Sequence, residues 1–379
     1  MSTFQRALTW SVSSCTPRWI KGPAVDISKT YKPWLPSRPS CRPQRRGVRA
    51  MTRPVALSPR CKLLWRTSRQ CCVLQAMTMP TARPIQRSAA SLELDIVWGA
   101  WAELGVSGWG RSHREWAVDP EPLIIVTPLI AARDARLRDE ALDWCIHNWR
   151  HISRVRLRNL LRAQPADVID AYAGFAATVN AHGGASWPGE SQAWSYAPTG
   201  RSTPPVLSRD SLIWLRMRAM FGVSARTEIL RYFLSHQQGP AGVNTLATAS
   251  GYTKRNIADE CATLQRAGVL TVRSALNRLY YSLDRDSQLR AFVGEPPPVL
   301  PDWTALFRLS RALVKLSEDA SRLPVRALNV EASRSLNDLE DELDRLDLSP
   351  PALQDDSWSA VRHFTDHTLK AWARGQWRN

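Results

Sequence analysis

The stretch from residue 242 to residue 284, GVNTLATASGYTKRNIADECATLQRAGVLTVRSALNRLYYSLD, constrains the fold more than any other part of the chain. Its pattern predicts a short helix over 243–249 and a longer helix over 254–267. Between them lies a tight turn in which Gly251 can adopt a positive φ. Thr253 is suited to cap the longer helix, and Gly268 to end it. Two β-prone pieces, VLTV and LYYSL, then flank the predicted hairpin loop RSALNR.

The longer helix has one apolar stripe, which predicts that it lies on the surface of a folded domain. Ile257, Ala258, Cys261 and Leu264 recur at i, i+1, i+4 and i+7. Two further helices precede this stretch, SLIWLRMRAMFG and ARTEILRYFLSH, each after a residue that can serve as a cap. We therefore predict one domain over residues 208–286, made of helices followed by a β-hairpin.

This order of elements resembles the winged helix-turn-helix of bacterial transcription regulators, of the arsenical-repressor and multiple-antibiotic-resistance types. The most telling match is LATASGYTKRNIADECATLQRAGVL, followed by an aromatic strand. In that family the helix after the turn enters the major groove of DNA, and the hairpin contacts the flanking backbone. The resemblance implies double-stranded DNA as a partner and implies these DNA-binding residues: Thr253, Lys254, Arg255, Asn256, Arg273 and Arg278.

The chemistry of these side chains suits DNA. The free backbone N–H groups at the start of a helix attract phosphate. Arginine can read guanine and asparagine can read adenine through paired hydrogen bonds, and hairpin arginines can contact phosphates. Asp259 and Glu260 follow closely on the same helix and would repel phosphate if they faced it. A second interpretation therefore stays open, in which the winged helix binds only protein.

The net charge of +17 does not by itself predict a nucleic-acid partner, because most of it lies in one segment. Residues 1–90 hold 17 of the 51 Lys and Arg and one of the 34 Asp and Glu. The rest of the chain is therefore almost neutral. Residues 1–90 also contain many prolines and no sustained periodicity, so we expect them to be disordered. They could be a basic arm, a misassigned upstream extension or, less in keeping with the prolines, a transit peptide.

The rest of the chain predicts a mainly α protein. Helical patterns fill residues 91–183, which we predict to be an all-α domain, and residues 300–376, a helical C-terminal region. Residues 184–207 are rich in Gly, Ser and Pro and predict a linker or a long surface loop. Four leucines at heptad-like spacing, at positions 336, 339, 343 and 346, predict either packing within the domain or a short dimer contact. We expect a homodimer.

Arg150, Arg154, Arg156, Arg158 and Arg162 lie close together with no acid among them. They predict a solvated face or a contact with an acidic partner, or else an additional nucleic-acid surface. No phosphate-binding glycine loop, nucleophile motif or set of metal-binding pairs occurs, so we expect no enzyme, no cofactor and no metal site. No apolar run is long enough for a transmembrane helix, and no membrane partner is expected. The two cysteines beyond residue 90 need no disulfide, which suits the cytoplasm.

The chain as a whole resembles actinobacterial helix-turn-helix proteins encoded beside nucleotidyltransferase toxins in toxin–antitoxin pairs. The points of likeness are WAELGVSGW, DPEPLIIVTPLI, LRDEALDWC and RLRNLLR, ahead of the winged helix and a helical tail. The resemblance implies a transcriptional autorepressor that also neutralises a partner toxin. The alternative is a winged-helix scaffold for proteins. A basic surface over Lys254, Arg255, Arg273 and Arg278 would favour DNA binding, and an acid-interrupted surface would favour the scaffold.

Overall fold

The computed structural model describes residues 87–107, 116–202, 205–235, 239–284, 286–353 and 356–377. This part of the chain is mainly helical, as predicted, and contains one small antiparallel sheet. Most of the segment predicted to be disordered, residues 1–86, lies outside the described residues. Residues 87–90, the end of the segment predicted to be disordered, are described and do not follow that prediction. Ser88 accepts a hydrogen bond from the Ser91 amide, and α1 begins at Ala89.

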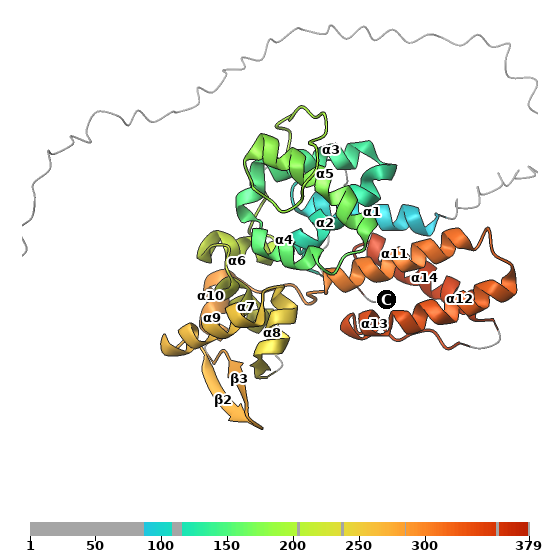
Figure 1. The fold of residues 1–379 in the computed structure, drawn as a ribbon. Coiled ribbons are helices and arrows are strands. Elements are labelled where there is room, and N and C mark those ends of the chain that lie inside the picture. The colour runs from blue at the N-terminus through green and yellow to red at the C-terminus, as the bar shows by residue number, and fades with distance from the viewer. Residues whose placement is uncertain are drawn as a thin grey trace, which may run out of the picture. The chain divides into compact units, whose positions relative to one another are not determined.

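The helices predicted over residues 91–183 are present. Asp134 and Ser153 cap α3 and α4 through their side-chain oxygens. Gly184 ends α5 with a φ of 69°, which glycine adopts without strain. The helices of this region (Figure 1) are α1 (Ala89–Glu103), α2 (Pro120–Ile130), α3 (Ala135–Asn148), α4 (Arg154–Leu161) and α5 (Ala166–Gly183), with 3₁₀ turns η3 (Ala131–Arg133) and η4 (Trp149–His151).

The segment over 184–207 contains no helix or strand in its described residues, yet it is attached to the helices before it. Trp187 is 4% exposed, and its backbone exchanges two hydrogen bonds with the Asn180 side chain. The buried Asp143 carboxylate accepts hydrogen bonds of 2.8, 2.8 and 3.0 Å from the amides of Thr199, Gly200 and Ser202. The segment is therefore a loop held against α3 and α5 rather than a free linker.

The helices near the C-terminus share a hydrophobic core with α1–α5, although the sequence predicted two separate regions. The fully buried Trp303 shows the connection, because its indole stacks on Trp116 at 5.2 Å between ring centroids and its N–H donates to the Ala117 carbonyl. These helices are α11 (Trp303–Asp319), α12 (Val325–Asp338), α13 (Glu340–Arg345) and α14 (Ser357–Ala373). Among the described residues, no helix combines the length and apolar character needed to cross a membrane.

The predicted leucine seam lies inside this same core. Leu336, Leu339, Leu343 and Leu346 are each at most 6% exposed. These leucines do not lie on one continuous helix, because α12 ends and α13 begins at Leu339. The seam therefore packs within the chain, and the interpretation of these leucines as a dimer contact is wrong.

Residues 208–286 contain a second core, built from one face of each helix and the inner side of the sheet. The three strands are antiparallel in the order β1-β3-β2, so β3 lies between the other two. The elements are η5 (Asp210–Leu212), α6 (Ile213–Phe221), α7 (Ala225–Ser235), β1 (Ala241–Gly242), α8 (Val243–Ser250), α9 (Lys254–Arg266), β2 (Thr271–Ala275) and β3 (Arg278–Ser282), followed by α10 (Asp286–Val293).

The hairpin has longer strands and a shorter loop than the sequence predicted. We expected a loop over 273–278, but only Leu276 and Asn277 form the turn. Both have positive φ values, 50° and 59°. A two-residue turn with both residues in this conformation matches the twist of the strands that it joins. Arg273 and Arg278 are consequently strand residues rather than loop residues.

Candidate functional site

The start of α9 is exposed, as the candidate DNA-binding residues require. Thr253, Lys254, Arg255 and Asn256 all lie on the surface. Thr253 caps the helix by accepting a hydrogen bond of 3.3 Å from the Asn256 amide. Its hydroxyl also donates to the Asn256 side-chain oxygen at 2.9 Å. One acceptor of Asn256 is thus engaged locally, which makes Lys254 and Arg255 the freer groups.

The opposite face of α9 holds the helix in place. Ile257, Cys261 and Leu264 are buried at 0, 0 and 5% exposure, which confirms the predicted stripe. Burial raises the pKa of the Cys261 thiol to about 12, so the thiol stays neutral. A buried, neutral thiol is a packing group rather than a nucleophile.

The hairpin presents its two arginines on one face. Arg273 pairs with Tyr280 across the strands, and Ala275 pairs with Arg278. Because side chains alternate along a strand, Arg273 and Arg278 share a face as diagonal neighbours. Val272 and Tyr281, which also pair, turn to the other face, where Tyr281 is 3% exposed and belongs to the core. Both arginines are exposed, and Figure 1 shows the hairpin extending beyond α9.

The balance of charge on these elements is positive. Residues 254–278 contain five bases and two acids. Within the described residues, Lys254, Arg255, Arg273 and Arg278 form no ion pair. Of the two acids, Glu260 is paired with Arg226 of α7 at 3.0 Å. Of the two acids of α9 in the described structure, Asp259 is the exposed one without an ion-pair partner, and the pairing of Glu260 reduces the predicted repulsion of phosphate.

A buried chain of ion pairs lies behind this module, and the sequence did not predict it. Arg156 donates to both oxygens of Asp119, at 2.6 and 2.5 Å, and to Glu121. Arg218 joins Glu121 to Glu228 through bonds of 2.6 to 3.0 Å, and Arg231 donates to Glu228 at 2.9 Å. The six residues are each at most 5% exposed. Three arginines therefore balance three carboxylates in the interior.

The carboxylate of Glu228 is stabilised by this arrangement. Burial alone raises the pKa of Glu228, but the adjacent Arg218 and Arg231 outweigh it and lower the pKa to about 2. Burial lowers the pKa of Arg156 and of Arg218, and their carboxylate partners more than compensate, so both stay charged. Arg156, Arg218 and Glu228 are therefore charged at neutral pH.

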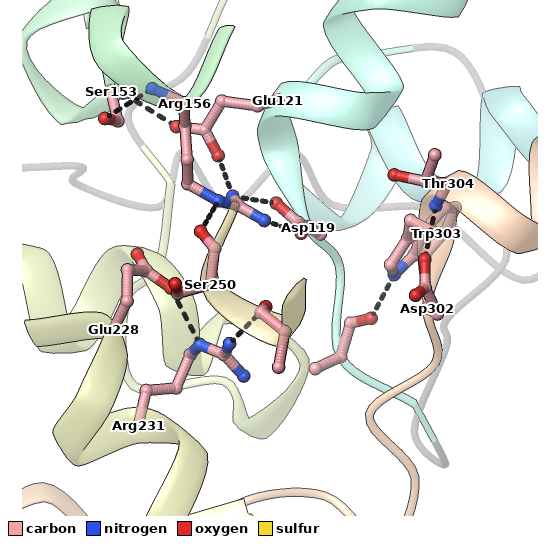
Figure 2. Close-up of polar contacts among 12 residues, drawn as sticks. Asp119, Glu121, Ser153, Arg156, Glu228, Arg231, Ser250, Asp302, Trp303 and Thr304 are labelled. Atoms are coloured by element: carbon pink, nitrogen blue, oxygen red, sulfur yellow. Dashed lines mark hydrogen bonds and ion pairs between the residues drawn. The ribbon is translucent and has the colours of Figure 1, made fainter. Parts of the chain in front are cut away.

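The helix that carries Arg156 of these buried ion pairs also holds the turn between α8 and α9. Arg156 Nε donates to the Ser250 carbonyl at 2.6 Å, as Figure 2 shows. Asn159 Nδ2 donates to the Gly251 carbonyl at 3.1 Å, and the hydroxyls of Ser153 and Tyr252 lie 2.8 Å apart. Each residue of the turn is therefore bonded to α4 or to its cap. This fixes α8 and α9 relative to the helices of residues 89–183.

Sequence reasoning missed these residues because it treated charge as a surface property. The sequence analysis grouped Arg156 with four neighbouring arginines. Those four are exposed, whereas Arg156 is buried, with 3% exposure. Asp119 is the N-cap residue of α2, yet its side chain makes no capping bond and binds Arg156 instead. Two of the motifs that carry the resemblance did contain these residues and could have drawn attention to them. DPEPLIIVTPLI contains Asp119 and Glu121, and RLRNLLR begins at Arg156.

No set of three or more His, Cys, Asp or Glu residues suited to a metal occurs in the part of the chain that the structure describes. The chain has no significant match among protein-family models, curated proteins or solved structures.

Proposed function

We propose that residues 208–286 are a winged helix-turn-helix and that the protein is a DNA-binding transcriptional regulator. The observation that carries this proposal is the exposure of Lys254 and Arg255, unpaired among the described residues, at the start of α9. The order α7, β1, α8, α9, β2, β3 supports it, because in this class of domain the helix after the turn and the hairpin are the elements that meet DNA.

In this proposal α9 enters the major groove with its first turn leading. Arg255 reads a guanine edge, while Lys254 and the free N–H groups of the turn bind phosphate. Arg273 and Arg278 contact the backbone beside the groove. Asn256 is a weaker candidate for base reading, because Thr253 already occupies its side-chain oxygen.

The regulator is proposed to act as a homodimer on two half-sites, as symmetric operators require. The leucines over 336–346 are not available for that dimer, since they lie in the core of the chain. The resemblance of the chain to proteins encoded beside nucleotidyltransferase toxins extends the proposal to an autorepressor that also binds a toxin. Cytoplasmic location and the absence of catalysis belong to the same proposal.

A second function, a winged-helix scaffold that binds only protein, is favoured by two observations. The tip of the hairpin is apolar, because Leu276 is 95% exposed and Leu279 is 51% exposed. Apolar side chains gathered on a protruding element are typical of protein contacts. The exposed Asp259 on α9 also favours the scaffold, because an acid at this position would repel phosphate.

The experiment that decides between them measures binding of the duplex upstream of the protein's own reading frame. The protein should begin at Thr81, because the basic residues before it would bind any DNA. Arg255→Ala should weaken binding by roughly 1–3 kcal/mol and relax the preference at one base pair. Arg266→Ala is the matched control, an exposed arginine about 16 Å further along the same helix.

The hairpin arginines should behave differently. Arg273→Ala and Arg278→Ala should weaken binding to all sequences alike and reduce the salt slope by about one each, because fewer counterions are released. If the protein gives no mobility shift at about 50 mM salt, the DNA-binding proposal fails and the scaffold replaces it. An equal loss for Arg255→Ala and Arg266→Ala would also refute the assignment of α9.

A further inference from the structure

A cleft of about 660 Å³ lies beside the buried chain of ion pairs. Its walls come from α4, α7, α8 and the start of α11. This size is typical of sites for small molecules. The proposed DNA-binding surface does not account for this cleft, since none of the six candidate DNA-binding residues lines it.

Arg231 is the one buried cation on the wall with an unused nitrogen. Its side chain is 3% exposed, and its Nε binds Glu228. Its Nη2 makes only a long bond of 3.4 Å to the Ala249 carbonyl, and Nη1 has no hydrogen-bond partner among the described residues. Figure 2 shows this nitrogen free of any marked contact. Trp214 covers one face of the guanidinium, 4.0 Å from the ring centre.

The charge of Arg231 is also the least compensated in the chain of ion pairs. Burial lowers the pKa of Arg231, and Glu228, which it shares with Arg218, does not restore the ordinary value. By contrast, the pKa values of Arg156 and Arg218 are raised by their carboxylates despite burial. A buried cation in this position gains from one additional negative partner.

The acids on the wall do not oppose an anion, because they are already occupied. Both oxygens of Asp119 bind Arg156. One oxygen of Asp302 accepts from the amides of Thr304 and Ala305, and the other binds Arg345. Among the buried charged side chains of the wall, the free hydrogen-bonding group is therefore a donor, Arg231 Nη1.

We propose that this cleft is an effector site for a small molecule that carries a carboxylate or phosphate group, bound through Arg231 Nη1. The same wall includes Arg156, Asn159 and Gly251, which join α4 to the turn before α9. A ligand that binds one arrangement of this junction more tightly than another changes the affinity of α9 for DNA, and DNA changes the affinity for the ligand by the same factor. This coupling rests on the proposed DNA-binding function, whereas the anion site does not.

The test uses the full chain with two probes, inorganic phosphate and benzoate, against chloride at equal ionic strength. A probe at about ten times its Kd should raise the thermal midpoint by roughly 3–6 °C. Two variants should remove the shift. Arg231→Gln deletes the donor, and Ala163→Trp adds bulk at the exposed rim while leaving every ion pair in place. Arg322→Gln, an exposed arginine outside the cleft, should keep the shift.

A shift from phosphate alone identifies a phosphate ligand, and a shift from benzoate alone identifies a carboxylate. No shift from either probe overturns the site. A shift that persists in Ala163→Trp overturns it too, even if Arg231→Gln fails to fold. DNA binding is measured separately, on the protein and variants that begin at Thr81. If the probes bind but DNA does not, the proposed function fails and the anion site stands.

Discussion

Replacing Arg156 with methionine tests the central role of the buried chain of ion pairs. The substitution keeps the length of an apolar stem and removes the guanidinium. Asp119 then loses its hydrogen-bond partner while remaining 5% exposed. Glu121 retains Arg218. The carbonyl of Ser250 loses the donor that holds the turn before α9.

The expected cost follows from that geometry. Removing one partner of a buried ion pair costs about 3–5 kcal/mol, mainly because a charge is left uncompensated. The lost bond to Ser250 belongs to the same guanidinium, so its contribution is included rather than added. We therefore expect Arg156→Met to lower the free energy of unfolding by about 3–5 kcal/mol and the thermal midpoint by roughly 10 °C.

Arg158→Met is the matched control, since Arg158 lies on the same helix but is exposed. It should change the free energy of unfolding by no more than about 0.5 kcal/mol. Urea unfolding followed by circular dichroism measures both variants. Hydrogen exchange adds a local readout, in which amides of α8 and α9 should exchange faster in Arg156→Met only. Equal, small effects of the two substitutions would refute the argument that the ion pairs fix the turn.

Three further substitutions test other parts of the structure. Gly251→Ala should lower the free energy of unfolding in urea by about 1–3 kcal/mol, which is more than Gly200→Ala should. Both glycines have positive φ, but only at Gly251 would the added carbon lie 3.2 Å from Arg156. Equal costs for the two substitutions would exclude that contact. Glu228 has a pKa depressed from 4.5 to about 2, so its contribution to stability is present above pH 4.5 and is lost as the pH falls toward 2. Glu228→Gln should thus flatten the fall in stability over that range, and an unchanged pH profile would contradict the assignment. Leu343→Ala should cost about 2–5 kcal/mol without changing the oligomeric state by light scattering, whereas a shift to monomer would restore the leucines as a dimer contact.

The local features of the fold could be predicted because each depends on residues a few positions apart. Thr253 caps its helix as predicted, since an N-cap bonds an amide two or three residues away. Gly251 adopts the expected positive φ of 69°. The apolar stripe of α9 follows from helical periodicity alone. The mainly α class and the exposed start of α9 come from the same local rules.

The hairpin shows where local rules become insufficient. Nothing in RSALNR indicates that Leu276 and Asn277 both take positive φ, because leucine is not favoured there. Pairing of the strands over their full length imposes the short turn. The positions of Arg273 and Arg278 on one face follow from that register and not from the loop that the sequence predicted.

Whether a charged side chain is solvated or buried was decided by the tertiary structure. Arg156 and Arg158 are indistinguishable by composition, yet Arg156 meets Asp119 and Glu121, which lie more than 30 positions earlier in the chain. The leucines at 336–346 were equally compatible with a dimer until the remaining helices covered them. Periodicity tells which face of a helix is apolar or charged, but the partner of that face comes from distant segments. The sequence by itself therefore determined the mainly α class, the Thr253 cap and the exposed start of α9, while only the assembled core determined which charges pair and which surfaces remain free.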